Sequence, residues 1–252
     1  MDLGIRGKRV LVTGASQGVG RATAMSFARE GCKVAVIARR REKLREVLEE
    51  MGGEKEGHSF YAVDLLEDGA PTTAIKELTA NKQPFDVVVH NVGGTLQVRD
   101  PLSPMEEWCR VWRFNVGIAI EINALVIPPM KARHWGRIIH ISSIGAEFLQ
   151  GSGPYAAAKV YLNAYTKILG RAVAPTGIVV SALMPGAFHA EGGHWDHARK
   201  TNPGMIEDFL RHHQAIGRLG SVEEISPFAL FMASQWVTFA TASVVPVDGG
   251  TM

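Results

Sequence analysis

The sequence predicts a single-domain α/β fold, a doubly wound parallel sheet of seven strands with helices on both faces. Short apolar runs rich in β-branched residues alternate along the chain with longer segments whose apolar residues recur at helical spacing. This alternation is typical of βαβ units, in which each strand is followed by a helix that covers the sheet. No internal repeat, low-complexity tract or long linker marks a boundary, so we expect one domain over residues 1–252.

Seven short apolar runs are the strand candidates. Because they alternate with helical segments, we expect them to pair in parallel and to be buried on both faces. In chain order they are Arg9–Val12, Lys33–Ala38, His58–Val63, Asp86–His90, Gly136–Ser142, Ile178–Met184 and Ser243–Val247.

Six segments between these runs carry helical spacing of apolar residues. They are Arg21–Glu30, Glu42–Met51, Ala70–Ala80, Glu106–Pro128, Tyr155–Ala174 and Val222–Gln235. The Pro128-Pro129 pair predicts the end of the fourth helix. The stretch from Pro185 to Gly220 is a long insertion after the sixth strand, rich in histidine, glycine and charge. Since long segments of this kind in compact domains are often lids or binding loops, we expect a substrate lid at about residues 187–217.

The composition indicates an ordinary globular protein without a nucleic-acid or membrane function. Of the 252 residues, 46% are hydrophobic and 21% charged, and the formal net charge of +2 lacks the basic excess of nucleic-acid binders. No apolar run approaches the ~20 residues that span a bilayer, and Met1–Arg6 lacks the apolar core of a signal peptide, so we expect a cytoplasmic protein. Cys32 and Cys109 have no metal-ligand spacing and cannot form a disulfide framework.

Three glycines lie where the first strand leads into the first helix, in the stretch TGASQGVG from Thr13 to Gly20. Glycine lets the backbone approach another group closely, but it costs roughly 0.5–1 kcal/mol relative to alanine inside a regular element. The helix that follows begins with unpaired amides and the positive end of a dipole, so a ligand phosphate fits the space that the missing side chains leave. The stretch is therefore either a phosphate-binding turn or an ordinary tight turn.

Candidate functional residues follow the predicted strands. In a doubly wound sheet, ligands bind beyond the carboxyl ends of the strands, near the point where the strand order reverses. The residues that follow the first six strands therefore gather at one edge: Gly14–Gly20, Arg39, Asp64, Asn91, Ser142-Ser143 and Pro185-Gly186.

A phenol and an ammonium lie four residues apart in Tyr155-Ala156-Ala157-Ala158-Lys159 and share one face of the predicted helix. A tyrosine is a poor acid or base at neutral pH because its unperturbed pKa is near 10, but a neighbouring cation stabilises the phenolate. Such a pair also occurs by chance on solvated helices, and the two serines could equally be strand-end residues that satisfy the next loop. Only their convergence argues for chemistry.

In this order and spacing, the motifs resemble those of the short-chain dehydrogenases and reductases over essentially the whole chain. Thr13–Gly20 matches the family's Thr-Gly-x-x-x-Gly-x-Gly, and His90–Gly93 matches its Asn-Asn-Ala-Gly with departures at His90 and Val92. The other matches are the adenine-contacting Asp64, the active-site helix Asn115, the Tyr155-x-x-x-Lys159 motif, Pro185-Gly186 and Val247–Gly250. The combination is highly specific and implies a Rossmann domain that binds NAD(P).

The resemblance implies an oxidoreductase that transfers hydride between a nicotinamide and a ketone or secondary alcohol. Tyr155 would donate or accept the proton on the substrate oxygen, and Lys159 would bind the ribose hydroxyls and lower the pKa of Tyr155. Ser143 would hydrogen-bond the same oxygen, and Asn115 would use its amide to hold a water that links Lys159 to solvent. The implied cofactor-binding residues are Gly14, Ser16, Gln17, Gly18, Val19, Gly20, Arg39, Arg40, Asp64, Leu65, Asn91, Gly93, Tyr155, Lys159, Pro185, Gly186 and Phe188.

The catalytic serine and one cofactor contact depart from the family pattern. Counted from the strand start at Gly136, the pattern falls on Ser143, whereas the usual separation from Tyr155 falls on Ser142. Since loops absorb a deletion more easily than a buried strand does, Ser143 is preferred. Ala190 stands where many members have a threonine that hydrogen-bonds the cofactor, so anchoring there would rely on backbone groups.

The end of the second strand favours NADP(H) over NAD(H). A NAD-selective member needs a carboxylate there for the ribose 2′-hydroxyl, and this chain has Ala38. The planar fork of Arg39 suits a 2′-phosphate, and Arg40 or Arg41 adds a second charge. Gln17 weighs against this preference, because some NADP-dependent relatives carry a basic residue there. We expect NADP(H) as the preferred cofactor and NAD(H) as the weaker alternative.

The insertion contains histidines, but no metal site is predicted. His194-x-x-His197 lacks a third ligand in any familiar zinc arrangement, although Glu191 and Asp196 lie nearby. We expect these histidines to be solvated or to face the substrate, and Phe188 and Trp195 to form either a wall over the substrate or core contacts. The histidines are His189, His194, His197, His212 and His213.

Substrate and assembly stay open from the motifs alone. The chain looks similar to 3-oxoacyl-acyl-carrier-protein reductases, and Arg171 with the region Arg133–Arg137 could present positive charge to an acidic carrier protein. Sugar, polyol and hydroxysteroid dehydrogenases share the same motifs. A nucleotide-binding regulator without turnover would be expected to have lost part of the Asn, Ser, Tyr and Lys set. The resemblance, the apolar Glu106–Pro128 and Tyr155–Ala174, and the terminal Pro246–Met252 favour a homotetramer.

Overall fold

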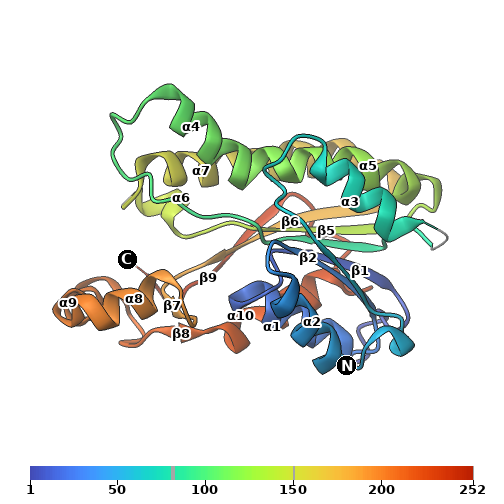
Figure 1. The fold of residues 1–252 in the computed structure, drawn as a ribbon, viewed down its shortest axis with the longest axis horizontal. Helices are drawn as coiled ribbons and strands as arrows, with labels where there is room; N and C mark the ends of the chain where they lie inside the picture. The colour runs from blue at the N-terminus through green and yellow to red at the C-terminus, as the bar shows by residue number, and fades with distance from the viewer. Residues whose placement is uncertain (81–82, 150, 252) are drawn as a thin grey trace.

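The computed structural model describes residues 1–80, 83–149 and 151–251, and its centre is one parallel sheet of seven strands (Figure 1). The strand order is β3-β2-β1-β4-β5-β6-β9, so β1 lies between β2 and β4 and the order reverses there. The strands are β1 (Arg9–Thr13), β2 (Lys33–Ala38), β3 (Ser59–Ala62), β4 (Val87–His90), β5 (Gly136–Ile141), β6 (Ile178–Pro185) and β9 (Ser243–Val247). The doubly wound (Rossmann) fold is confirmed, and no strand boundary differs from the predicted one by more than one residue.

Helices cover both faces of this sheet. They are α1 (Gly18–Arg29), α2 (Arg41–Glu50), α3 (Ala70–Thr79), α4 (Met105–Trp112), α5 (Ile118–Ala132), α6 (Gly145–Phe148), α7 (Gly153–Val173) and α10 (Val222–Ala233). Helices α3, α4, α5 and α7 lie on one face, and α1, α2 and α10 lie on the other (Figure 1). Short 3-10 turns span Glu54–Glu56 and Ala174–Thr176.

In the described chain, every strand of the sheet except β9 contributes to two cores, one on either side of the sheet. On β1, Val10 and Val12 join the core under α1 and α10, whereas Leu11 joins the core under α3 and α5. All three side chains are fully buried. Since burying such a side chain stabilises the fold by about 1.5–3 kcal/mol, the alternation specifies which face each strand residue presents.

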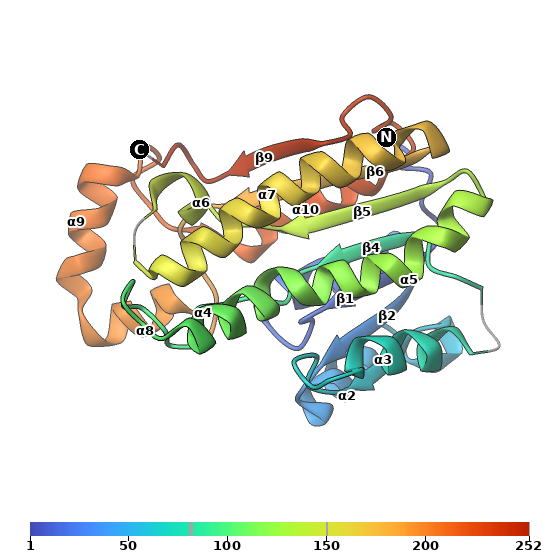
Figure 2. The same cartoon turned by 90° about the horizontal axis from the view of Figure 1, so that it is seen from above.

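The insertion after β6 folds around two helices and a short parallel ladder. Helices α8 (His194–Thr201) and α9 (Pro203–His213) lie between β7 (Phe188–His189) and β8 (Gly220–Ser221), which pair with each other. In Figure 2 both helices lie beyond the arrowheads of the strands, at the carboxyl edge of the sheet.

The fourth predicted helix departs from expectation. It consists of α4, a π-helical turn over Arg113–Gly117, and α5, which continues past the proline pair. Pro128 and Pro129 lie inside α5, so the prediction that they end the helix was wrong. Each proline removes one backbone hydrogen bond, but the neighbouring Ile127 and Met130 are buried in the core, and their packing favours a continuing helix.

The stretch Met105–Ala132 is long and apolar enough to cross a membrane by length and composition, with a hydropathy of 1.3. This differs from the expectation, which rested on uninterrupted apolar runs. In the structure 56% of its most apolar window is buried, and α5 packs on the sheet. The core helix of a globular protein passes the same test, so the finding is weak evidence for a membrane span.

Candidate active site

The turn between β1 and α1 is shaped by glycines and by polar contacts from β4. Gly14 and Gly18 have φ values of +66° and +57°, in the left-handed region that favours glycine. A Cβ on Gly20 would lie 2.4 Å from Asn91 Nδ2 and 2.5 Å from the Gly14 carbonyl oxygen, so a larger residue does not fit. Asn91 Nδ2 donates to that carbonyl at 3.1 Å, and the Asn91 amide donates to Thr13 Oγ1 at 3.1 Å. These two hydrogen bonds hold Asn91, at the end of β4, against the turn.

The first turn of α1 suits an anion. Its N-cap residue, Gln17, makes no side-chain cap, so no capping oxygen satisfies the first amides of the helix. In the described chain, a Cβ on Gly18 would make an ordinary contact with the Ala190 Cβ, 3.7 Å away, so the turn lies next to the chain after β6. The uncapped amides lie at the positive end of the α1 dipole, which favours an anion.

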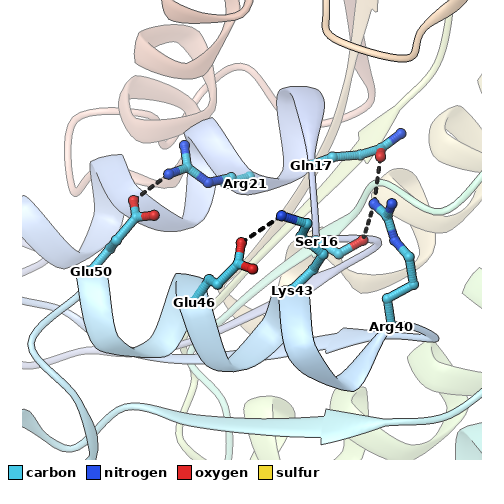
Figure 3. Close-up of polar contacts among 7 residues, drawn as sticks. All are labelled: Ser16, Gln17, Arg21, Arg40, Lys43, Glu46 and Glu50. Atoms are coloured by element: carbon cyan, nitrogen blue, oxygen red, sulfur yellow. Dashed lines mark hydrogen bonds and ion pairs between the residues drawn. The ribbon is translucent and has the colours of Figure 1, made fainter.

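Arg40 reaches from the start of α2 to the glycine turn (Figure 3). Its guanidinium donates to Gln17 Oε1 and, at 3.3 Å, to Ser16 Oγ. These acceptors are neutral, so this group of contacts leaves the charge of Arg40 uncompensated. The other cations drawn in Figure 3 are paired with carboxylates, Arg21 with Glu50 and Lys43 with Glu46.

The two neighbouring arginines have different surroundings. Arg39 Nη1 lies 3.8 Å from Asp64 Oδ2, and the Arg39 side chain is 65% exposed. The Arg41 guanidinium lies over the Phe60 ring, 5.7 Å from its centroid. Ala38, the last residue of β2, is buried and carries no charge. Arg39 therefore contacts a predicted cofactor-binding residue, whereas Arg41 packs on an aromatic ring.

Tyr155 is positioned by the first turn of α7. Ser152, the N-cap, accepts from the Tyr155 amide at 3.2 Å and donates to the Val98 carbonyl at 2.6 Å. A Cβ on Gly145 would lie 3.3 Å from Ser143 Oγ and 3.8 Å from Tyr155 Cε1, so the two side chains meet at this glycine, and Ser143 Oγ accepts from the Gly145 amide at 3.1 Å. Burial raises the pKa of the Tyr155 phenol, and the nearby Ser143 hydroxyl opposes this rise. The phenol is therefore protonated at neutral pH.

The two serines after β5 differ in their contacts. The Ser142 amide donates to the Leu183 carbonyl at 2.7 Å and continues the ladder between β5 and β6. Its hydroxyl is buried and has no hydrogen-bond partner among the described residues. Ser143 Oγ and the Tyr155 ring both lie beside Gly145, so Ser143 is the serine that faces Tyr155.

Lys159 is buried one turn beyond Tyr155. Its ammonium donates to the Ile141 carbonyl at 2.8 Å and lies 5.6 Å from the centroid of the Tyr155 ring. Burial lowers the pKa of Lys159 to about 7. The pKa of Tyr155 is nevertheless raised overall, because burial of the phenol is its largest contribution.

Asn115 lies in the π-helical turn, a distortion that is frequent at functional sites. Its Oδ1 accepts from the Gly94 amide at 3.0 Å, and its Nδ2 donates to the carbonyls of Gly94 and Val111, both at 2.9 Å. A Cβ on Gly93 would lie 2.6 Å from Asn115 Oδ1 and 3.0 Å from Lys159 Nζ, so the two side chains meet at this glycine. Both amide hydrogens are in use. Of the side-chain amide, Oδ1 is therefore the atom with capacity left to hold the expected water.

Sequence reasoning missed two residues that hold the predicted ones. Ser152 had a local signal, since a serine shortly before a Gly-Pro pair is typical of a helix N-terminus. Gly94 had none, because its contact with Asn115 joins residues 21 positions apart.

The chain after β6 passes close to β9. The Gly186 amide donates to the Val247 carbonyl at 3.1 Å, and a Cβ on Gly186 would lie 2.6 Å from the Asp248 Cα. Phe188, in β7, lines a cavity of about 190 Å³ together with Gln214. Two further predicted cofactor contacts, Val19 and Leu65, are buried in the fold.

Trp195 packs within the insertion. Its ring centroid lies 4.5 Å from that of Phe209 and 5.3 Å from that of His194, so it joins α8 to α9. Beside it, the buried Asp196 accepts from Lys200 Nζ at 2.8 Å. Of the two interpretations of Trp195, a packing contact is the one that the structure shows. In the part of the chain that the structure describes, no group of three His, Cys, Asp or Glu side chains could hold a metal ion.

Comparison with known proteins identifies the family. Residues 8–199 match the family model of the short chain dehydrogenases. The chain belongs to the short chain dehydrogenase family. The resemblance inferred from the motifs is thereby confirmed, and the protein is an oxidoreductase that acts on CH–OH or keto groups.

Relatives match this short chain dehydrogenase over nearly its whole length. The 3-oxoacyl-[acyl-carrier-protein] reductase of Pseudomonas aeruginosa is 33% identical over 255 residues, which cover 98% of each chain. Gluconate 5-dehydrogenase of Gluconobacter oxydans is 30% identical over 252 residues, which cover 98% of this chain and 95% of the relative.

Two solved structures are similarly close in fold. L-Sorbose reductase from Gluconobacter frateurii, complexed with NADPH and L-sorbose, has a TM-score of 0.90 at 29% identity and covers 99% of this chain and 98% of its own. A 3-oxoacyl (acyl-carrier-protein) reductase from Agrobacterium tumefaciens with NADP bound has a TM-score of 0.89 at 27% identity, with coverage of 98% and 95%.

Proposed function

We propose that this short chain dehydrogenase is an NADP(H)-dependent enzyme that interconverts a ketone and a secondary alcohol at Tyr155. The observation that carries the proposal is the half-buried phenol of Tyr155, which lies beside the Ser143 hydroxyl at Gly145 and one helical turn from the buried Lys159. These groups lie at the carboxyl edge of the sheet, where doubly wound sheets bind their ligands. With Asn115 the set of four is complete, which argues against a nucleotide-binding regulator without turnover.

The chain's residues fit a dinucleotide with a 2′-phosphate. The uncapped first turn of α1 suits the pyrophosphate. Arg39 and Arg40 lie where β2 ends, and Ala38 brings no carboxylate to repel a phosphate. Gln17, which weighed against NADP(H) in the sequence, is an acceptor for Arg40. The related structures with NADPH or NADP bound support the same cofactor.

Reduction is the direction that the ionisation states favour. The bound nicotinamide supplies the hydride. Tyr155, protonated at neutral pH because burial raises its pKa, donates its proton to the substrate oxygen, while Ser143 hydrogen-bonds that oxygen as charge develops on it. Lys159 stabilises the phenolate that remains, since its ammonium lies beside the ring. Its pKa of about 7 lets it exchange a proton near neutral pH.

We propose a small free ketone as the substrate, with a carrier-bound 3-oxoacyl group as the alternative. The sequence relatives include 3-oxoacyl-[acyl-carrier-protein] reductases, whereas a structural relative is a sugar reductase. Of the arginines expected to meet a carrier protein, Arg137 is buried and donates to the Ser234 carbonyl, and Arg133 lies 3.5 Å from Asp86. Arg171 alone of the predicted arginines is exposed without such a contact in the described chain. This weak positive surface favours the free ketone.

We also propose a cytoplasmic homotetramer with the insertion as its substrate lid. Exposed apolar side chains lie on α4 and α7 and, separately, on and after α10. Two distinct self-complementary faces are what a tetramer with three two-fold axes needs. The first set is Trp112, Tyr161 and Ile168, and the second is Phe228, Phe231, Trp236 and Phe239. Of the terminal segment expected at a contact, Met252 lies outside the described residues.

A substrate panel tests the proposed function. We expect NADPH-dependent reduction of at least one member of a set containing L-sorbose, 5-oxogluconate and a 3-oxoacyl thioester, and loss of that activity in Tyr155→Phe with NADPH binding retained. Tyr161→Phe is the matched control on the same helix, because the change keeps the ring that packs against Trp112 and lies outside the proposed site. Binding of NADPH without turnover of any member would favour the regulator instead. Retention of the wild-type rate by Tyr155→Phe would refute the mechanism.

A further inference from the structure

A buried chain of polar side chains lies between the sheet and helices α5 and α7, apart from the groups that the proposed reaction uses. His90 Nε2 lies 2.8 Å from Asn123 Oδ1, Asn123 Nδ2 lies 3.3 Å from His140 Nε2, and His140 Nδ1 lies 2.8 Å from Thr166 Oγ1. Each of these four residues is at most 4% exposed. Asn123 Nδ2 also donates to Tyr165 Oη at 3.2 Å.

The hydrogen bonds between these side chains run in one donor-to-acceptor direction, given the positions of the oxygen and nitrogen in the Asn123 side-chain amide. Asn123 Oδ1 can only accept, so His90 Nε2 is the donor. Asn123 Nδ2 can only donate, so His140 accepts at Nε2 and donates from Nδ1 to Thr166. Thr166 Oγ1 then donates to the Leu162 carbonyl at 2.8 Å. The chain therefore ends in the backbone of α7.

Both histidines are neutral in this arrangement. Burial lowers the pKa of His90 to about 4, and burial together with nearby His90 and Lys159 lowers the pKa of His140 well below its usual range. A buried polar chain costs free energy wherever a group stays unsatisfied, and His90 Nδ1 has no partner among the described residues. Apolar side chains of similar volume would avoid this cost, so stability does not account for the chain.

The chain connects the strands that carry the proposed site. His90 on β4 directly precedes Asn91, which holds the glycine turn. His140 on β5 directly precedes Ile141, whose carbonyl accepts from Lys159. His90 and His140 are partners in the β4–β5 pairing, with ring centroids 5.2 Å apart. A displacement of either histidine would therefore be passed to a site residue next to it.

The chain also connects the two helices that carry the site. Asn123 lies on α5, which continues directly from the π-helical turn of Asn115. Thr166 lies on α7 seven residues after Lys159, which is two turns along the same helix face. The apolar cluster that joins α7 to the π-helical turn is small, and its buried members in the described chain are Val116, Ala158 and Leu162. Apolar packing therefore specifies the position of α7 only weakly at this point.

We propose that His90, Asn123, His140 and Thr166 are positioning residues that hold α7 in register with β5. In that register Tyr155 lies beside Ser143 and Lys159 donates to the Ile141 carbonyl, and the proposal rests on the function proposed for Tyr155, Lys159 and Ser143. A misplacement of about 1 Å at a reacting group costs about 10²-fold in rate, so a small slide of α7 is sufficient to matter.

Matched substitutions at Thr166 test the proposal. Thr166→Val removes the hydroxyl at nearly constant volume, and Thr166→Ser keeps it. We expect Thr166→Val to lower kcat per folded molecule by about tenfold or more while KM for NADPH stays within about twofold, and Thr166→Ser to restore most of kcat. Thr23→Val is the control, because Thr23 is equally buried on α1 and its hydroxyl has no partner in the described chain. A merely structural role would lower Tm and leave kcat of the folded enzyme unchanged.

A second pair tests the other end of the chain. His90→Gln places an amide N–H near the position of His90 Nε2, whereas His90→Leu removes the donor. We expect His90→Gln to retain a large part of kcat and His90→Leu to lose about tenfold. If Thr166→Val and His90→Leu both kept kcat within about twofold of the wild type, the positioning role would be refuted.

Crystal structures of the wild type and Thr166→Val give a result that needs no turnover. We expect the separation of Tyr155 Oη and Ser143 Oγ to increase by about 0.5 Å or more, on the scale at which reacting groups lose alignment. An unchanged separation would contradict the proposal. A wild type that reduces no ketone would refute the proposed function, and this distance would still decide the positioning role.

Discussion

The hydroxyl of Ser143 meets the Tyr155 phenol, while that of Ser142 is buried without a partner in the described chain. Ser143→Ala should therefore lower kcat by about 10²-fold, the usual cost of removing one hydrogen-bond donor to a developing oxyanion. Ser142→Ala should stay close to the wild type. Steady-state kinetics of both variants check this prediction. A loss confined to Ser142→Ala would show that the alignment through β5 is wrong.

Cofactor preference also belongs to the residue scale. Arg39 and Arg40 should make kcat/KM with NADPH at least about tenfold higher than with NADH, since each charge-assisted hydrogen bond contributes roughly 1.5–3 kcal/mol and Arg39 is largely exposed. Ala38→Asp combined with Arg39→Leu should reverse the preference. Arg41→Leu is the control, because Arg41 stacks on Phe60. Equal or better use of NADH by the wild type would show that the arginines do not read the phosphate.

The buried histidines should make the fold sensitive to acid. Unfolded histidines take up a proton near pH 6.5, whereas folded His90, with its pKa lowered to about 4, and folded His140 resist it. The free energy of unfolding should therefore be highest above pH 6.5. Between pH 6.5 and pH 4 it should fall as the pH falls, by up to about 1.4 kcal/mol per pH unit for each histidine. The titratable groups that face the pair are Tyr165 and Lys159.

Denaturant unfolding between pH 7 and pH 4.5 measures this dependence. His90→Gln carries one fewer titrating group and should show a shallower fall in the free energy of unfolding than the wild type. Identical slopes for the two proteins would argue that His90 is protonated in the folded state.

At the scale of elements, the turn between β1 and α1 tolerates no side chain at Gly20. Gly20→Ala places a methyl group 2.5 Å from the Gly14 carbonyl oxygen, so the turn must shift. We expect a lower Tm and at least about tenfold weaker NADPH binding, since overpacking of this kind costs about 1–3 kcal/mol. Gly204→Ala in α9 is the control, because its Cβ would meet only Asn202 Oδ1 at 3.9 Å. Fluorescence titration with NADPH and thermal unfolding measure both effects, and unchanged NADPH affinity in Gly20→Ala would separate the turn from the cofactor.

The proline pair in α5 shows that packing between elements can override the local rule that a proline ends a helix. A proline removes one backbone hydrogen bond of a helix, but burial of Ile127 and Met130 is available only if the helix continues. The insertion shows the same limit. Its sequence predicts no regular elements, yet Trp195 and Phe209 join two helices by a contact that no local periodicity reveals.

At the scale of the whole molecule, the two exposed apolar faces predict a tetramer of 27.3 kDa chains. Ile168→Glu on α7 and Phe231→Glu on α10 should each reduce the tetramer to a dimer, and the double variant should be a monomer, since a buried unpaired charge disfavours association. Light scattering at micromolar concentration measures the mass. A monomeric wild type would refute the prediction.

The strands, their parallel pairing and the edge at which the functional residues gather follow from the sequence alone. Each short apolar run lies within one segment of the sequence, between helical segments. It marks a strand to within one residue, because a strand that is buried on both faces is apolar along its whole length. Residues that follow parallel strands share one edge in any arrangement of the helices, so Asp64, Asn91 and Ser143 could be placed before any contact was known.

The contacts between those residues do not follow from the sequence. Which serine meets Tyr155, the course of α5 past Pro128, and the joining of His90 to His140 through Asn123 are properties of the folded molecule. Each depends on side chains from separate elements, and their energies of burial and hydrogen bonding arise only when those elements pack. The apolar pattern within one segment predicts whether that segment is a helix or a strand. The geometry of the site depends instead on contacts between residues that lie tens of positions apart in the sequence.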